Sequence, residues 1–149
     1  MHQTFAFGRT FRAAAALALV GFASACNDST TTAEPEPDVA SVRVTVGAQV
    51  VTISETGQQT GTLTLGQGTT PVTVAWLRAD GSADPVVNSE DFEVRLVAQG
   101  STGISFTPGG PFAGTLSATS AGQKVVQVQL HHLEEAHDEF GQNLTLTVQ

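Results

Sequence analysis

Residues 131 to 140 read "HHLEEAHDEF", and this short stretch holds most of the side chains in the sequence that could do chemistry. It contains three of the chain's four histidines, with four carboxylates interleaved among them. Imidazole and carboxylate groups are ligands that suit Zn²⁺, Ni²⁺ and Cu²⁺. Two interpretations follow. The stretch is either a divalent-metal site or the solvated tip of a β-hairpin, where ion pairs contribute little.

Side-chain direction along this stretch predicts which groups can meet. His132 continues the buried alternation of the strand before it, so it should lean over the open end of the core, whereas His131 should face solvent. If the chain then turns helical, Glu134 and His137 become neighbours, and one stripe gathers His131, Glu134, Glu135 and Asp138. The candidate ligands are therefore His131, His132, Glu134, Glu135, His137 and Asp138. The preferred set is His132 and His137 with one of Glu134, Glu135 or Asp138.

Other metal sites fit this stretch less well. Cu⁺ prefers thiolate or thioether ligands, but the chain has no methionine beyond Met1 and its single cysteine is expected to be acylated. The spaced Asp/Asn and glycine pattern of a calcium loop is missing. A carboxylate-type di-iron site needs Glu-x-x-His twice, and the sequence has it once. Zn²⁺ or another divalent metal is thus the one cofactor that the stretch suggests.

The sequence carries no motif of a common enzyme class. It has no G-x-S-x-G, no G-x-x-x-x-G-K and no G-x-G-x-x-G. A hydrolytic metal centre would need three ligands, an open coordination position and a general base, and no substrate cleft is evident. The chain is therefore expected not to be an enzyme.

The first 25 residues have the composition of a secretory signal. A basic segment precedes the apolar run "AAAALALVGF", which is shorter than the about 20 residues that span a bilayer. Ala23, Ser24 and Ala25 then precede Cys26, the only cysteine. This arrangement resembles the lipobox of bacterial lipoproteins, although Ala23 replaces the usual leucine. The resemblance implies that residues 1–25 are removed and that Cys26 is lipidated. The alternative is a free thiol, which is unusual in an exported protein.

Residues 26–38 are expected to form a flexible acidic tether. They contain no large apolar residue, and their Pro-Glu-Pro stretch favours an extended conformation. Without residues 1–25 the chain keeps four basic residues against fourteen acidic ones, a net charge of −10. Such a surface repels nucleic acid, which is excluded as a partner. The lipid would hold the protein in the cell envelope, on the periplasmic face or at the cell surface.

Residues 39–149 predict an all-β domain. Apolar residues recur with period two in about seven runs, which is typical of strands with one buried face. The runs begin with "VRVTV" and "TLTL", continue through "VTVAW", "FEVRL" and "ISF", and end with "VQVQL" and "LTLTV". Turn signals such as Asp80-Gly81 separate them. The pattern favours a single antiparallel β-sandwich, with a small barrel as the alternative.

The later part of this domain resembles a bacterial Ig-like domain of group 2. The similarity lies in "GTLSATSAGQKVVQVQ", residues 114 to 129, at Gly114, Leu116, Ala121, Gly122, Val126 and Val128. It implies an Ig-like sandwich with a structural or adhesive role and no fixed active-site residues. The histidine-rich segment is not part of that pattern. It is expected to form a long hairpin tip, residues 133 to 142, at the end of the sandwich where binding loops commonly lie.

Two functions follow from these features. The first is a membrane-anchored exported lipoprotein whose Ig-like domain is a non-enzymatic binding or structural module, with a protein or an envelope polymer as partner. The second is a periplasmic or surface protein that binds a divalent metal through residues 131–138.

Overall fold

The computed structural model describes residues 35–149. The predicted signal segment, Cys26 and the tether up to residue 34 lie outside the described residues. The described part belongs to one compact unit, Glu34–Gln149, and contains no helix, so none that could cross a membrane. Its ten strands are β1 (Ser41–Val46), β2 (Gln49–Ser54), β3 (Gln59–Thr60), β4 (Thr64–Leu65), β5 (Gly68–Leu77), β6 (Phe92–Ala98), β7 (Ile104–Gly110), β8 (Ala113–Ala118), β9 (Gly122–His132) and β10 (His137–Val148).

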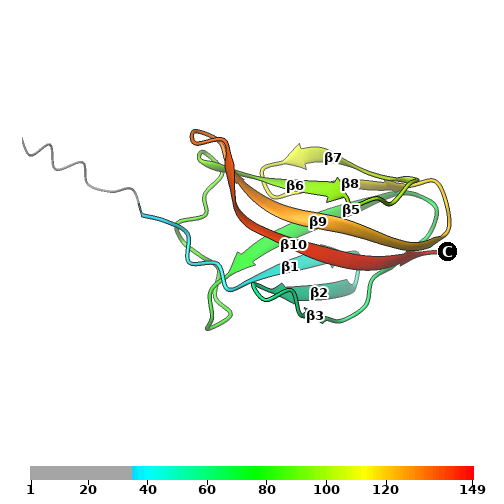
Figure 1. Cartoon of the computed structure of the whole chain (residues 1–149), viewed down its shortest axis with the longest axis horizontal. Coiled ribbons are helices and arrows are strands. Elements are labelled where there is room, and N and C mark those ends of the chain that lie inside the picture. Colours follow the sequence, from blue (N-terminus) through cyan, green and yellow to red (C-terminus); the bar gives the residue numbers. More distant parts are fainter. Residues whose placement is uncertain (1–34) are drawn as a thin grey trace, which may run out of the picture. The chain divides into compact units, whose positions relative to one another are not determined.

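The strands form two sheets that face each other, which confirms the predicted all-β sandwich and excludes the closed barrel (Figure 1). One sheet has the order β3-β2-β1-β5-β8-β7 and the other has the order β4-β10-β9-β6. All neighbours are antiparallel except the short β4, which runs parallel to β10. The seven predicted runs all coincide with strands. The alternation did not mark β2, β3 and β8, and the "TLTL" run is reduced to the two residues of β4.

Seven of the strands are connected in the order of an Ig-like sandwich. Constant-type Ig domains place strands A-B-E-D in one sheet and C-F-G in the other. Here β1-β5-β8-β7 and β6-β9-β10 follow that order, with the chain passing through them in the same sequence. The remaining strands β2, β3 and β4 lie between the first and second of these seven. They widen one sheet beyond β1 and add a short edge to β10.

The core lies between the sheets and consists of the alternate apolar residues that the period-two pattern predicted. Each long strand contributes side chains that are almost fully buried, such as Val44 in β1, Leu130 in β9 and Leu144 in β10. Trp76 of β5 contacts Phe140 of β10 across the core with its ring edge, at a centroid distance of 5.6 Å. Strands with one buried face and one polar face can bury their apolar side in this way without leaving backbone groups unpaired.

Several connections meet at one end of the sandwich, which we call the tip end. They are the segment before β1, the connections between β2 and β3 and between β5 and β6, and the turn between β9 and β10 (Figure 1). The carboxylate of Asp84, in the β5–β6 connection, is buried and accepts a hydrogen bond from the backbone N–H of Asp38 at 2.6 Å. The segment before β1 is thereby fastened to the β5–β6 connection.

Candidate metal centre

The histidine-rich stretch continues the β9–β10 ladder and does not form a long loop. His132 pairs with His137, so the turn is only Leu133–Ala136, and the expected tip over residues 133–142 is wrong. The helical alternative for this stretch is not adopted, because the backbone from His137 onward pairs with β9. The pairing persists since Phe140 extends the buried face of β10 opposite Leu130.

A β-bulge at Glu139 decides which side chains of β10 face the core. Asp138 pairs with His131 and Phe140 pairs with Leu130, so Glu139 is an extra residue without a partner of its own. An extra residue in one strand re-aims the side chains around it. Glu139 therefore lies on the same side of the hairpin as His137 and His132, while Asp138 points to the outer side with His131.

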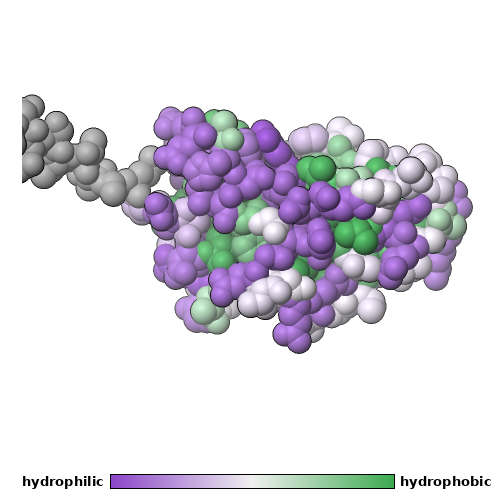
Figure 2. All heavy atoms as spheres, viewed as in Figure 1, coloured by the Kyte–Doolittle hydropathy of each residue, from purple (hydrophilic) through white to green (hydrophobic). Residues whose placement is uncertain are grey.

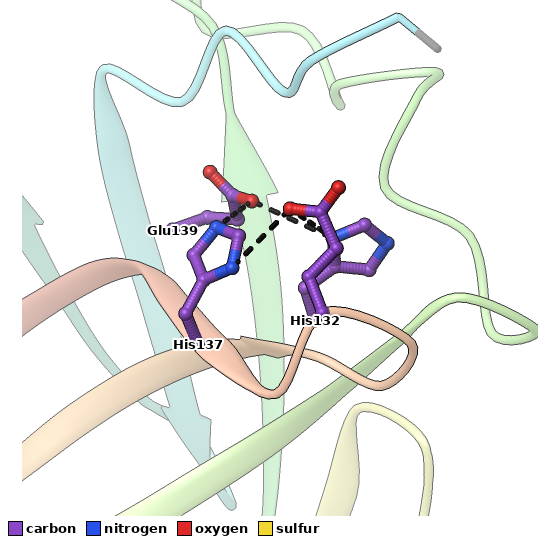
Figure 3. Close-up of side chains that lie close together, drawn as sticks. His132, His137 and Glu139 are labelled. Atoms are coloured by element: carbon purple, nitrogen blue, oxygen red, sulfur yellow. Dashed lines mark ion pairs between the residues drawn. The ribbon is translucent and has the colours of Figure 1, made fainter.

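Four side chains meet above the end of the core as a cluster: His132, Glu135, His137 and Glu139. One nitrogen or oxygen atom from each lies within 4.8 Å of the others. Figure 3 shows His132 from β9 converging with His137 and Glu139 from β10. His132 Nδ1 lies 3.6 Å from Glu135 Oε2 and 3.7 Å from Glu139 Oε1. His137 contacts Glu135 Oε2 through Nδ1 at 3.3 Å and Glu139 Oε1 through Nε2 at 2.7 Å.

His132 is the buried member of this cluster. Its ring stacks on Phe92, with centroids 4.7 Å apart and an interplanar angle of 19°, and its side chain is 9 % exposed. Its Nδ1 atom is buried and has no hydrogen-bond partner among the described residues. A buried polar atom without a partner costs about 1–3 kcal/mol, so such an atom in a native protein calls for an explanation.

An ion-pair network explains only part of the cluster. A protonated His137 between Glu135 and Glu139 would account for three of the four side chains. It leaves His132 unexplained, because contacts of 3.6 and 3.7 Å are too long for hydrogen bonds. A metal ion would satisfy all four groups at once, since it accepts the lone pair of a neutral imidazole.

The spacing of the cluster suits a small tetrahedral cation. Zn²⁺ binds nitrogen and oxygen ligands at about 2.0–2.2 Å, which separates neighbouring tetrahedral ligands by about 3.4 Å. The contacts of His132 Nδ1 and His137 Nδ1 with the two carboxylates measure 3.3, 3.6 and 3.7 Å. The fourth contact, of 2.7 Å, involves His137 Nε2, which could not bind the same ion as Nδ1. Two carboxylates also balance the charge of a divalent ion. The cluster therefore has the composition and spacing to hold a metal of the Zn²⁺ type.

The charge of the described residues is concentrated at the same end. The connections at the other end, residues 47–48, 61–67, 99–103 and 119–121, contain no acidic side chain. Hydrophilic side chains crowd the hairpin tip in Figure 2. The negative charge at this end raises the local concentration of cations around the cluster. The acidic residues of the tip end are Glu36, Asp38, Glu55, Asp80, Asp84, Glu90, Asp91, Glu93, Glu134, Glu135, Asp138 and Glu139.

Three of the predicted ligands enter the cluster and three do not. His132 leans over the end of the core as predicted, and Glu135 and His137 join it. Glu134 is exposed and lies outside the cluster. His131 and Asp138 form a separate pair on the outer face, with a hydrogen bond of 2.8 Å between Nδ1 and Oδ1.

His131 does not face solvent, which corrects the prediction made from alternation. Its side chain is 9 % exposed because β9 is an inner strand of its sheet. Glu93 of β6 flanks it on one side and Asp138 of β10 on the other. Alternation assigns a residue to a face, but only the neighbouring strands determine whether that face is covered.

Glu139 is the member of the cluster that the sequence did not predict. Alternation extended backward from Leu144 and Phe140 places residue 138 on the inner face and residue 139 on the outer face. The bulge reverses this assignment, and no residue type in the stretch predicts the bulge. The only signal was that Glu139 is the fourth carboxylate of "HHLEEAHDEF".

Comparison with known proteins assigns no family to the chain. A scan against protein-family models and a search of curated proteins both find no match. We therefore infer a function from the chemistry of the cluster and from the features of the sequence.

Proposed function

We propose that this chain is a lipid-anchored exported protein that binds a divalent transition-metal ion, with Zn²⁺ as the best-fitting ion, at the cluster of His132, Glu135, His137 and Glu139. The observation that supports this most directly is His132 Nδ1, a buried nitrogen without a hydrogen-bond partner among the described residues, directed at two carboxylate oxygens. The export signal and the lipobox-like segment ending at Cys26 support a location in the cell envelope.

The ligand set favours binding over catalysis. Four side-chain ligands would complete a tetrahedral coordination sphere, whereas catalytic zinc sites use three protein ligands and keep one position for water or substrate. Access differs within the set, because Glu135 and His137 are 61 % and 47 % exposed while His132 is buried. An ion could thus enter and leave through the turn without unfolding of the sandwich. These features suit a protein that buffers or delivers the ion.

The proposal is tested by calorimetric titration of Zn²⁺, Ni²⁺ and Cu²⁺ into residues 27–149. We expect one site per chain with micromolar or tighter affinity for Zn²⁺. His137→Ala and Glu139→Gln should each weaken it at least tenfold, since each removes one ligand. Glu134→Gln is the matched control, because it removes a carboxylate from the same turn but outside the cluster. Equal losses in Glu134→Gln and Glu139→Gln, or no stoichiometric heat at all, would refute the proposal.

A second candidate is a non-enzymatic binding or structural module that presents the tip end to a protein or an envelope polymer. One observation favours it: Leu133, in the turn beside the cluster, is 44 % exposed. Loops at the ends of Ig-like sandwiches commonly carry recognition. One variant distinguishes the two functions. Leu133→Ser should abolish capture of such a partner and leave Zn²⁺ affinity unchanged.

A further inference from the structure

We infer that His131 and Asp138 are positioning residues for the metal centre, acting from the opposite face of the hairpin by holding the bulge that places Glu139 in the cluster. This inference rests on the proposed metal-binding function. Neither side chain belongs to the cluster, and both lie on the side of the sheet that faces away from the core.

The pair lies directly beside the irregular step of the ladder. His131 Nδ1 and Asp138 Oδ1 are 2.8 Å apart, and these two residues are also cross-strand partners in the backbone pairing. The next pair along the hairpin is Leu130 with Phe140, so the extra residue Glu139 falls between two fixed points. On one side it is fixed by the His131–Asp138 bond and on the other by the burial of Phe140 in the core.

Two registers compete for this stretch of β10. In a regular ladder continued from Phe140, Glu139 would pair with Leu130's neighbour His131 and face outward, and Asp138 would face inward. A one-residue slip moves every side chain of a strand to the other face. The regular register would therefore take both Glu139 and His137 out of the cluster and place Asp138 on the inner face. The shorter side chain of Asp138 would replace that of Glu139 and would start from a different backbone position.

The His131–Asp138 bond exists only in the bulged register. The bond is between an imidazole and a carboxylate, and the His131 side chain is largely buried. Hydrogen bonds that involve a charged group are stronger than neutral ones, so this bond favours the register that contains it. Asp138 thus influences the metal centre by keeping its own carboxylate outside and that of Glu139 inside.

Asp138 variants test this role in residues 27–149 with Zn²⁺ as the probe. Asp138→Ala removes the bond, whereas Asp138→Asn removes the same charge but keeps an oxygen acceptor for His131. We expect Asp138→Ala to weaken Zn²⁺ binding about tenfold. Asp138→Asn and the charge control Glu134→Gln should cause only a small, equal loss from reduced negative potential. Gln99→Ala, which breaks the remote outer-face contact between Gln99 and Gln127, should have no effect.

A double-mutant cycle with Glu139→Gln shows whether Asp138 acts through Glu139. If it does, the extra loss of affinity in Asp138→Ala over Asp138→Asn becomes smaller once Glu139 is replaced, because only His137 then remains to be held on the inner face. Additive losses would overturn the inference, and so would equal losses in Asp138→Ala and Asp138→Asn. These outcomes differ from failure of the proposed function, in which the unaltered protein binds no Zn²⁺.

The register itself provides a readout that does not depend on metal. Cross-strand nuclear Overhauser effects between His131 and residue 138 report the bulged pairing. In Asp138→Ala we expect these signals to weaken and contacts between His131 and Glu139 to replace them, while Asp138→Asn retains the original pattern. An unchanged pattern in Asp138→Ala would show that the pair does not hold the bulge.

Discussion

Ala136 provides a direct test of the turn that brings Glu135 and His137 together. It is the only non-glycine residue with positive φ among residues 35–149, at 54°, and its backbone N–H donates to His132 O at 3.0 Å. The left-handed conformation costs an L-residue about 1–2 kcal/mol, and glycine avoids this cost. Replacing Ala136 with glycine should therefore stabilise the folded protein.

The expected change in the free energy of unfolding follows from two opposing effects. Ala136→Gly relieves about 1–2 kcal/mol of strain, but glycine has more freedom in the unfolded chain, which costs about 0.4–1 kcal/mol. The net gain should be about 0.5–1 kcal/mol. For a domain of about 115 residues, an unfolding entropy of about 2.1 cal/mol/K per residue converts this gain to a rise in Tm of about 2–4 °C.

Urea and thermal unfolding, followed by fluorescence, measure this change. Trp76 is the only tryptophan, the chain has no tyrosine, and Trp76 is buried against Phe140, so its emission reports the core beneath the cluster. Ala75→Gly, in the middle of β5, is the matched control and should lower stability by about 0.5–1 kcal/mol. If Ala136→Gly lowers stability as Ala75→Gly does, Ala136 is not left-handed and the described turn is wrong.

Three further predictions concern the core, the metal and the β5–β6 connection. Phe140→Ala should lower the free energy of unfolding by about 3–5 kcal/mol in urea titrations, because it empties a site packed against Trp76; a loss under 1 kcal/mol would contradict that packing. Zn²⁺ affinity should fall between pH 7.5 and 5.5, because ligand histidines must be neutral and free histidine is protonated below about pH 6.5; equal affinities in calorimetry would argue against histidine ligands. Hydrogen bonds from Ser82 lower the pKa of Asp80. Their stabilising effect is therefore fully present at pH values above the ordinary pKa of an aspartate, and it is lost as the pH falls through the lowered pKa. Ser82→Ala should raise the Asp80 pKa in an NMR titration, and an unchanged value would refute this assignment.

Local alternation was sufficient to predict the sandwich. The period of two is a property of each strand by itself, so Val42 and Val44, or Leu144 and Leu146, could be assigned to the core without knowledge of their partners. The same reasoning placed His132 over the end of the core. It missed β8, because glycine and small residues such as Gly114 interrupt the apolar pattern there.

The site was only partly predictable, because membership depends on how two strands pair. The sequence identified the stretch, the ligand chemistry and three of the four clustered residues, since all of these depend on residue type and position in the chain. The exchange of Asp138 for Glu139 could not be predicted in this way. It results from one unpaired residue between two cross-strand pairs, which is a property of the ladder and not of either strand.

Residue types and their order therefore determined the period-two strands, the acidic character and a histidine–carboxylate stretch that can bind metal. The tertiary structure decided which of these groups meet. The burial of His131 comes from β6 and β10 on either side of it. His132, whose Nδ1 has no hydrogen-bond partner among residues 35–149, stacks on Phe92, about 40 positions away in the chain. Packing between strands that are distant in sequence has no local signature, so it becomes visible only when the sheets are assembled.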